Sequence, residues 1–464
     1  MSAAWRLLST AQRLADGPRL WALTRGVLES ADEVALAESS VWGLGRVLAG
    51  EHDELWGGVI DLPRDDDAVA VLLDVLVSVP ADDVIVIRDG VASVARLRPT
   101  ERVPEGDPVT CRPDGTYLVT GGLGVLGLEV ADWLADRGAR RLVLAGRRPL
   151  PPRHTWQTWH DDGDERIRRI QALEARGVTV RVVSLDIADA ARTARVLAAL
   201  DLPPIRGVVH AAGVLDNRLS RDTDADSLRA VLSPKAGGAW TLHSLFPPGS
   251  LDFLALFSSC GYLLGLPGQA AYGAANAFLD ALAAHRPDTV SLGWTSWRGM
   301  GMARNDIVDR ELKARGVTDI SRDEAFEAWD HAARLGAAHF PVFGVTEPGD
   351  TEQLPILSEV TTARPTASAV VVEDSFTGLP PAQLRERLLV EVGAQIAGEM
   401  RLPAAALDVR RSLVEQGLDS VLTMVVRRRL EKRFGQKLPT TLLWHQPSVS
   451  AITDHLVTAL STRS

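Results

Sequence analysis

Short apolar runs alternate with longer segments of helical periodicity over the first 345 residues. In the first 112 residues, three runs are typical of strands and two of helices. The strand-like runs are 20–24, 57–62 and 83–97, and the helical stretches are 41–50 and 68–79. Strands that alternate with helices predict an α/β fold. No strand here runs into a glycine-rich turn, so we expect no nucleotide site in residues 1–112.

The same alternation is stronger in residues 113–345. The β-rich runs are 116–122, 141–146, 178–186, 205–213, 251–259, 289–294 and 339–345. Helical stretches such as 126–137 and 166–176 separate them. This pattern predicts a doubly wound, parallel Rossmann-type sheet.

The pattern changes again after residue 345. Residues 346–380 are rich in Thr, Ser, Pro and Glu and are interpreted as a linker. Amphipathic helices follow at 381–399, 420–434 and 448–460, with a short one expected near 440. They predict a small all-α bundle in residues 381–464.

Composition narrows the functional classes. The chain has 464 residues, 46% of them hydrophobic and 24% charged, and a net charge of −10, which argues against a nucleic-acid partner. Its two cysteines show neither disulfide nor metal-type spacing. No apolar run approaches the roughly 20 residues of a membrane span, and the N-terminus lacks a signal peptide. We therefore expect a cytoplasmic protein without a membrane contact or a metal.

Gly121, Gly124 and Gly127 form a G-x-x-G-x-x-G turn between a predicted strand and a predicted helix. Glycine allows the sharp turn and the close approach of a pyrophosphate. The phosphates would then meet the positive end of a helix dipole. The turn therefore predicts dinucleotide binding.

Arg147 and Arg148 follow the next strand, where an NAD site usually presents an acidic residue. A guanidinium pairs with the 2′-phosphate, so this position favours NADPH; the alternative is a pair of solvated surface arginines. Asp186, after the following strand, is a candidate to accept a hydrogen bond from the adenine amine. The alternative for Asp186 is a helix N-cap.

Tyr272 stands among small residues, four positions before Asn276. A carbonyl that receives a hydride needs a proton, which a tyrosine can donate once a nearby positive charge lowers its pKa from about 10. Ser259 can donate a hydrogen bond to the same oxygen. The alternative for Tyr272 is a buried core phenol, and for Ser259 and Asn276 a loop or cap position.

These residues make region 113–345 resemble a ketoreductase of the short-chain dehydrogenase/reductase superfamily. Tyr-x-x-x-Asn, with the lysine moved upstream into a segment like "SPKAGGAW", is similar to the ketoreductases of polyketide synthases. The resemblance implies that Lys235 supplies the ammonium beside Tyr272, with a surface lysine as the alternative. It also implies further cofactor contacts, at Val125, Leu126, Ile187, Ala211, Ala212 and Gly213. His210, which precedes the last three, is interpreted as structural.

The resemblance extends to "WGLGRVLAGEHDELWGGVIDLP" (42–63), which is similar to the degenerate structural half of such ketoreductases. Residues 1–112 are then expected to be an N-terminally truncated part of it. Two family fingerprints of hydroxyl configuration are both incomplete. One is met here as Leu215-Asp216-Asn217, and the other has Leu264 in place of its tryptophan. The configuration therefore stays open.

"GLDS" (417–420) opens the predicted helix 420–434 and resembles the attachment site of acyl carrier proteins. The resemblance implies 4′-phosphopantetheine on Ser420; the alternative is a simple N-cap. The helix continues with the basic run "RRRLEKR" (427–433), interpreted as a solvated face or as a docking surface for an acidic partner. The segment also resembles iterative synthases of the methylsalicylate type.

The sequence thus predicts an NADPH-dependent reductase of a carrier-tethered β-ketoacyl thioester, acting in secondary metabolite biosynthesis. The resemblance implies the partners: a polyketide chain, ketosynthase, acyltransferase and dehydratase-like domains, a phosphopantetheinyl transferase, and a homodimeric parent synthase. Two alternatives stay open, a free-standing NADP-dependent dehydrogenase of a diffusible ketone and a non-catalytic scaffold that docks the carrier.

Overall fold

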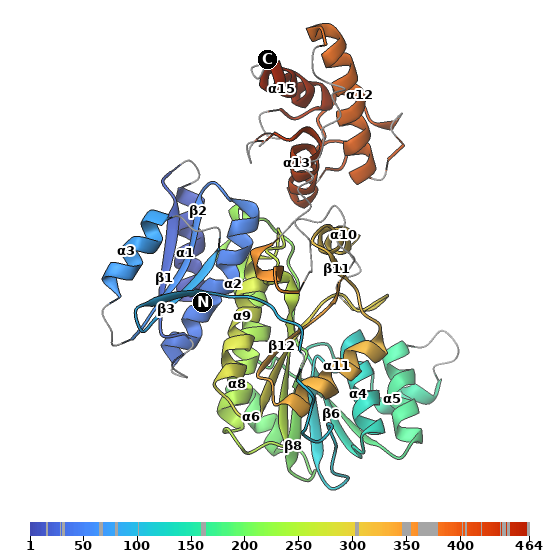
Figure 1. Ribbon diagram of the computed structural model, residues 1–464. Helices are drawn as coiled ribbons and strands as arrows, with labels where there is room; N and C mark the ends of the chain where they lie inside the picture. Colours follow the sequence, from blue (N-terminus) through green and yellow to red (C-terminus); the bar gives the residue numbers. More distant parts are fainter. Residues whose placement is uncertain are drawn as a thin grey trace. The chain divides into compact units, whose positions relative to one another are not determined.

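The computed structural model forms two compact units, whose elements are traced in Figure 1. The larger unit comprises residues 1–216 and 220–361, and the C-terminal unit comprises 217–219 and 362–464. The structure describes the chain except residues 15–16, 28, 30–32, 65–67, 79–81, 101, 159–163, 302–305, 346–353, 361–378, 401, 404–405, 419, 437, 439–441, 443–445 and 462–464. Most of the predicted linker 346–380 therefore lies outside the described residues.

A seven-stranded parallel sheet forms the centre of the larger unit, with the order β12-β10-β9-β8-β5-β6-β7. Its strands are β5 (Thr116–Thr120), β6 (Arg141–Gly146), β7 (Thr179–Ser184), β8 (Ile205–His210), β9 (Phe253–Ser259), β10 (Thr289–Trp294) and β12 (His339–Val342). The chain starts in the middle and winds outward in both directions, which confirms the predicted doubly wound fold.

Helices cover both faces of this sheet (Figure 1). They are α4 (Val125–Asp136), α5 (Glu165–Ala175), α6 (Ala190–Ala198), α7 (Ala225–Leu232), α8 (Gly238–Leu245), α9 (Ala270–Ala284) and α11 (Arg322–Leu335). Another helix, α10 (Asp306–Ala314), packs beside the short strand β11 (Val317–Thr318). Successive residues of a strand point to opposite faces. Accordingly Leu118 of β5 packs in one core, whereas Tyr117 and Val119 pack in the other. Burial on both faces explains the almost continuous apolar runs of these strands.

A second sheet, with the order β1-β2-β3-β4, is built by the first hundred residues. Its elements are α1 (Ser2–Arg13), β1 (Leu20–Arg25), α2 (Glu33–Glu51), β2 (Trp56–Leu62), α3 (Val69–Ser78), β3 (Val84–Arg88) and β4 (Val91–Val94). The predicted strand 83–97 is wrong as a single strand, because Asp89 and Gly90 take positive φ and turn the chain into an antiparallel hairpin. We call residues 1–94 the N-terminal half of the larger unit.

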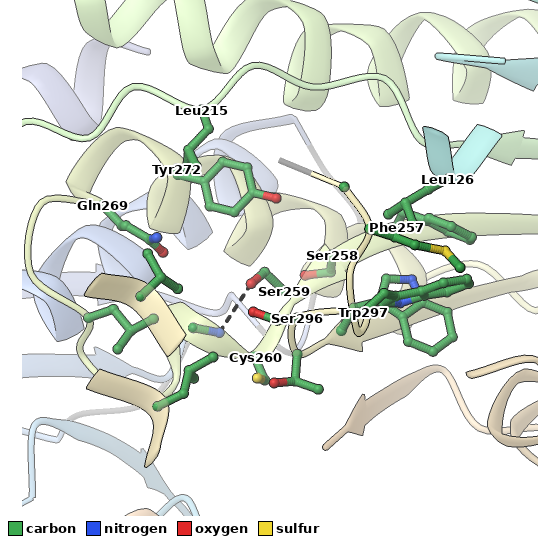
Figure 2. A pocket seen from close by; sticks show the side chains of 18 of the residues that line it. Leu126, Leu215, Phe257, Ser258, Ser259, Cys260, Gln269, Tyr272, Ser296 and Trp297 are labelled. Carbon is green, nitrogen blue, oxygen red and sulfur yellow. Dashed lines mark hydrogen bonds between the residues drawn. The ribbon is translucent and has the colours of Figure 1, made fainter. Parts of the chain in front are cut away.

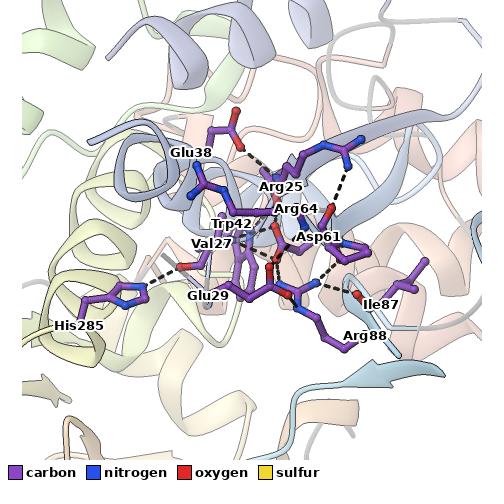
Figure 3. A network of polar contacts seen from close by, with 12 residues as sticks. Arg25, Val27, Glu29, Glu38, Trp42, Asp61, Arg64, Ile87, Arg88 and His285 are labelled. Carbon is purple, nitrogen blue, oxygen red and sulfur yellow. Dashed lines mark hydrogen bonds and ion pairs between the residues drawn. The ribbon is translucent and has the colours of Figure 1, made fainter. Parts of the chain in front are cut away.

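Polar residues fill the carboxyl ends of β1, β2 and β3, the edge where a Rossmann sheet holds its ligand (Figure 3). Asp61 of β2 is completely buried and accepts a hydrogen bond of 2.6 Å from Thr24 Oγ1. Arg88 forms ion pairs with Asp61 and with Glu29. The first sheet thus uses this edge for an internal ion network, in agreement with the lack of a glycine-rich turn in its sequence.

The described residues of the C-terminal unit include three long helices: α12 (Pro381–Glu399), α13 (Ser420–Phe434) and α15 (Val449–Ser461). Their buried faces share one apolar core, which includes Leu388, Val392, Leu430, Ile452 and Leu456. The three long predicted helices are confirmed. The short helix expected near residue 440 falls mostly outside the described residues.

The basic run of α13 makes contacts within its own unit. Arg429 and Arg433 pair with Glu399 and Glu391 of α12, at 3.5 and 2.7 Å. Arg427 is only 4% exposed. Arg429 and Arg433 therefore help to pack α13 on α12, while the Arg429 side chain stays 59% exposed, as a solvated face predicts. Of these three arginines, that interpretation is wrong for Arg427 alone, because Arg427 is buried.

Helices α2 and α9 join the N-terminal half to the seven-stranded sheet. They approach closely because glycines meet at their crossing: a Cβ added to Gly43 would lie 2.0 Å from the carbonyl oxygen of Gly273. That oxygen belongs to a helix backbone and cannot move aside like the end of a side chain. The approach of the two helices therefore requires glycine at position 43.

We expect Gly43→Ala to destabilise the larger unit by about 1–3 kcal/mol, the usual cost of overpacking a core. Gly398→Ala is the control, because a Cβ added there meets no atom within 4 Å and alanine favours a helix by up to about 1 kcal/mol. Thermal unfolding followed by circular dichroism measures both. Equal stability of Gly43→Ala and wild type would contradict the tight crossing.

Candidate active site

Three of the four predicted catalytic residues line one pocket at the carboxyl edge of the seven-stranded sheet. Lys235, Ser259 and Tyr272 come from three separate segments of the chain and line this pocket. Figure 2 shows Ser259 and Tyr272 there. Leu126 and Ala211, both predicted cofactor contacts, line it as well. The fourth residue, Asn276, lies one turn along α9 from Tyr272.

Tyr272 sits in the first turn of α9, which begins at Ala270. The small residues around it are nearly all buried, and Ala271, Ala274 and Ala275 belong to the core under the helix. Small side chains let α9 pack closely against its neighbours, while Tyr272 extends into the pocket (Figure 2). The alanine-rich context of the tyrosine is thus a packing requirement of its helix.

Lys235 belongs to a short π-helical segment, Ser233–Gly237, between α7 and α8. Its side chain is 3% exposed, and its ammonium donates a hydrogen bond of 2.6 Å to the carbonyl oxygen of Phe257. The Nζ atom lies 5.0 Å from the centre of the Tyr272 ring. A π-turn inserts one extra residue into a helix and is frequent at functional sites.

Burial changes the acid–base properties of this pair. It lowers the pKa of Lys235 to about 8, while the charge of Asp280 acts in the opposite direction. Loss of hydration raises the pKa of Tyr272 to about 12, with a smaller opposing effect of Asn276. Desolvation is the largest cause of this shift. The predicted lowering of the phenol pKa, which also depends on a positive nicotinamide ring, stays a prediction. Tyr272 holds its proton at neutral pH, the state that a proton donor needs.

Ser259 ends β9 and turns the chain into the short 3₁₀ segment Cys260–Tyr262. Its Oγ accepts a hydrogen bond of 3.2 Å from the backbone N–H of Gly261. Because that bond uses a lone pair of the hydroxyl, the hydroxyl proton stays available for an acceptor in the pocket. The side chain is thus held in place and can still act as a donor.

Asn276 is fully buried and uses its amide N–H to bond the carbonyl oxygen of Tyr272 at 2.9 Å. Its Oδ1 has no hydrogen-bond partner among the described residues. A buried amide oxygen normally has a partner. Asn276 therefore fixes the first turn of α9, and its Oδ1 can still accept a hydrogen bond.

The glycine turn lies between β5 and α4, as its spacing predicts. Gly121 has φ of +68°, and a Cβ added there would lie 2.7 Å from the carbonyl oxygen of Ala211. A Cβ on Gly127 would lie 2.3 Å from the carbonyl oxygen of Gly121. Gly124 is the N-cap of α4, and Val125 is its first residue. This glycine-lined helix start fits a pyrophosphate, which needs backbone N–H groups and close approach.

A second pocket adjoins this turn at the carboxyl ends of β5, β6, β7 and β8. Its lining includes most of the other predicted cofactor contacts, which are Gly121, Arg147, Asp186, Ile187, Ala212 and Gly213. Arg147 is exposed and belongs to the lining of this pocket. Arg148 is also exposed but is not part of the lining.

Asp186 is not the N-cap of the following helix. The side chain of Asp189 caps α6 by accepting from the N–H of Arg192, whereas the carboxylate of Asp186 accepts from the N–H of Ala188 at 3.1 Å. Asp186 is exposed and lines the second pocket. The contacts thus exclude the simplest structural alternative for this residue.

His210 has the structural role that the sequence suggests. Its ring nitrogens bond Thr120 Oγ1 at 2.7 Å and the carbonyl oxygen of Lys235 at 2.8 Å. Burial lowers its pKa to about 4, so the ring is neutral. His210 thereby links the β5 end, beside the glycine turn, to the π-helical segment that holds the lysine.

Sequence reasoning missed one wall of the first pocket. Trp294, Ser296, Trp297 and Met300 line it from the end of β10 and the loop behind it. The sequence did offer one signal for this wall. The loop follows a predicted strand of the parallel sheet, and such loops meet at the carboxyl edge, where these sheets bind their ligands.

Ser420 is the first residue of α13. The N-terminus of a helix favours a phosphate. Asp419, the residue before it in the predicted attachment motif, lies outside the described residues. The described helices include none with the length and apolar character of a membrane span.

Comparisons with known proteins divide the chain into two matched regions. Residues 115–299 match the KR domain model, and residues 391–456 match the model of the phosphopantetheine attachment site. The chain is 45% identical to the 5-methyl-1-naphthoate synthase of Streptomyces sahachiroi, over 95% of this chain and 25% of that protein. It is 40% identical to the 6-methylsalicylic acid synthase of Penicillium patulum, over 97% and 26%. It thus spans about a quarter of the length of these relatives.

Solved structures add a likeness that covers most of both chains. The fold matches an A-type ketoreductase from a modular polyketide synthase with a TM-score of 0.67 and 33% sequence identity, covering 76% of each chain.

The buried ammonium generates a prediction about stability. The pKa of Lys235 is about 8 in the folded protein, whereas a lysine side chain in an unfolded chain has its ordinary value of 10.5. Between these two pH values the unfolded chain therefore binds the proton more tightly than the folded protein does. The stability of wild type relative to Lys235→Met should therefore rise with pH across this window, by roughly 3 kcal/mol. Chemical denaturation at pH 7.5 and 10.5 measures it. For Lys313→Met, which removes an exposed lysine, the stability difference from wild type should hardly change with pH. If the difference between wild type and Lys235→Met were equally independent of pH, the buried ammonium would be contradicted.

Proposed function

The chain belongs to the ketoreductase family of type I polyketide synthases, with a phosphopantetheine attachment segment behind the reductase, and we propose that it reduces a β-keto group on a chain held by that carrier. NADPH is the proposed reductant and Ser420 the proposed attachment residue. One observation carries the proposal: the Lys235 ammonium lies 5.0 Å from the Tyr272 ring in a pocket that Ser259 also lines.

The proposed cofactor site follows the two pockets. Gly121, Gly124 and Gly127 would hold the pyrophosphate at the start of α4, with Val125 and Leu126 in its first turn. Arg147, assisted by Arg148, would pair with a 2′-phosphate, which supports NADPH over NADH. The remaining contacts, toward the adenosine half and the cofactor floor, are assigned to Asp186, Ile187, Ala211, Ala212 and Gly213.

Bound NADPH would supply a hydride to the β-carbonyl carbon. The residues of the pocket act on the oxygen of the same carbonyl. Ser259 donates a hydrogen bond to this oxygen as negative charge develops on it. Tyr272 donates its proton and completes the alcohol, and the Lys235 ammonium stabilises the resulting phenolate. Asn276 holds the turn that carries Tyr272.

The carrier segment supplies the substrate in this proposal. A phosphopantetheine arm on Ser420 would present the β-ketoacyl thioester at a high effective concentration, on the order of millimolar for short tethers. The other partners proposed are the ketosynthase, acyltransferase and dehydratase-like domains of the same synthase. Relatives named for methylsalicylate and methylnaphthoate support a synthase that makes a reduced aromatic product.

Mass spectrometry on the tethered acyl group tests this function. After incubation with a phosphopantetheinyl transferase and a β-ketoacyl-CoA, we expect NADPH to add two hydrogen atoms to the acyl group of the wild type. Tyr272→Phe should load equally well but lose the proton donor, with a rate at least about 100-fold lower. Its affinity for NADPH should stay within about twofold, because the phenol hydroxyl is not part of the second pocket.

Ser420→Ala controls the carrier assignment and should accept no acyl group. Reduction of a diffusible ketone combined with no loading of Ser420 would instead favour a free-standing dehydrogenase. Loading without NADPH oxidation, on tethered or diffusible substrate, would favour the scaffold.

The choice of cofactor has its own test. Arg147→Ala should weaken NADPH binding by about 10- to 100-fold, the usual worth of a charge-assisted hydrogen bond, and leave NADH binding unchanged. Arg176→Ala is the matched control, because Arg176 is exposed and lines neither pocket. Titration by protein fluorescence measures both cofactors. An equal loss of NADPH and NADH affinity would contradict the 2′-phosphate contact.

A further inference from the structure

We propose that Glu51, the last residue of α2, is a positioning residue for the reduction. Its carboxylate lies in the N-terminal half of the larger unit and holds two loops that border the active-site pocket. The inference rests on the proposed function and adds to it a residue outside the matched reductase region 115–299.

Glu51 is 1% exposed and uses both carboxylate oxygens. Oε1 accepts a hydrogen bond of 2.7 Å from the backbone N–H of Gly268, and Oε2 accepts one of 2.7 Å from the backbone N–H of Ser220. Gly268 and Ser220 are far apart in the sequence. One buried carboxylate therefore bridges two segments, each of which presents a backbone donor to it.

The first of these segments leads into the helix of the proton donor. Gly268 is followed by Gln269, the N-cap of α9, whose side chain lines the pocket. Gly268 has φ of +80°. The same loop also touches α2 at Gly265, where an added Cβ would lie 2.9 Å from the carbonyl oxygen of Arg46. The position of Tyr272 thus depends on a turn that Glu51 and the end of α2 hold from outside.

The second segment follows β8 along the chain and comes after the predicted cofactor contacts Ala211, Ala212 and Gly213. Leu215, five residues before Ser220, lines the pocket. Two other residues of the N-terminal half bind Ser220 as well: His52 lies 3.0 Å from its Oγ, and Gln12 donates to its carbonyl oxygen at 2.8 Å. Figure 2 shows Leu215 and Gln269 beside Tyr272 at one end of the pocket. Glu51 therefore holds two segments that each contribute a residue, Leu215 or Gln269, to the lining of the pocket.

A carboxylate is required at this position for a geometric reason. It offers two acceptor oxygens and no donor, so it can satisfy two backbone N–H groups at once. Glutamine has the same shape but replaces one oxygen by an N–H₂ group, which would face a backbone donor. The Glu51→Gln variant therefore keeps one bond, loses the other and leaves a buried donor unpaired.

Helix α9 has a second tie to the N-terminal half at its other end. His285, the C-cap of α9, lies 3.0 Å from the carbonyl oxygen of Val27 (Figure 3). The α2–α9 crossing at Gly43 lies between the two ties. Loss of the Glu51 contact should therefore loosen the turn at Gly268 and Gln269 that leads into Tyr272, while α9 from Gly273 onward stays docked.

Steady-state kinetics and product analysis on the full chain test the proposal. For Glu51→Gln we expect kcat to fall by about 10- to 100-fold, since misplacement of about 1 Å has effects of this size. NADPH affinity should change by less than about twofold. The ratio of the two hydroxyl configurations should shift by at least about fivefold, because Leu215 and Gln269 border the tyrosine. This ratio does not depend on the folded fraction, so a purely structural role would not move it.

Two variants of the same helix serve as controls. Glu51→Asp keeps two acceptor oxygens and no donor but is one methylene shorter, so it should recover only part of the rate and of the product ratio. Glu38→Gln makes the same change at an α2 carboxylate that accepts a hydrogen bond from the exposed N–H of Arg25, and it should behave like wild type. Unchanged kcat and product ratio in Glu51→Gln would overturn the proposal.

Hydrogen exchange separates this inference from the proposed function. In Glu51→Gln, the peptides that contain Ser220 and Gly268 should exchange at least about tenfold faster than in wild type and in Glu38→Gln. This measurement needs no turnover. If the wild type reduced no substrate, the proposed function would be wrong, but the bridge from Glu51 to Ser220 and Gly268 could still be tested. Equal exchange in all three proteins would overturn the bridge itself.

Discussion

The contact between a buried ammonium and a phenol ring is the constraint around which the larger unit is organised. Lys235 Nζ lies 5.0 Å from the ring centre of Tyr272, and its hydrogen bond to the Phe257 carbonyl ties it to β9. Placing a charge there costs desolvation energy, which lowers the pKa of the lysine to about 8. The surrounding structure must therefore hold the side chain in place. The π-turn, and His210 bonded to the lysine's own carbonyl, do so.

The phenol is held from another direction, by the half of the unit that has no cofactor turn. Its helix α9 crosses α2 at paired glycines, and Glu51 bridges the loop before α9 to the loop after β8. The first sheet meanwhile uses its own ligand edge for the Asp61–Arg88 ion network. The N-terminal half thus serves as a support, which positions groups on the half that carries Tyr272.

The C-terminal unit is held together by simpler contacts. Its three long described helices share one apolar core, and two arginines of α13 pair with glutamates of α12. In the proposed function this unit contributes a serine at a helix start, where a phosphate is electrostatically favoured, and the chemistry stays with the larger unit.

The sequence by itself determined the fold class, the glycine turn at Gly121, and the chemical identity of the residues around Tyr272, because these depend on local periodicity and side-chain type. It could not give the direction of the phenol pKa, the hairpin at Asp89, or the bridge of Glu51. Each of these depends on what the fold brings next to a residue: the apolar surroundings that remove water from Tyr272, and two backbone donors from distant loops that meet one carboxylate. Only the tertiary structure decides such neighbours, since burial and hydrogen bonding across long sequence distances leave no pattern along the chain.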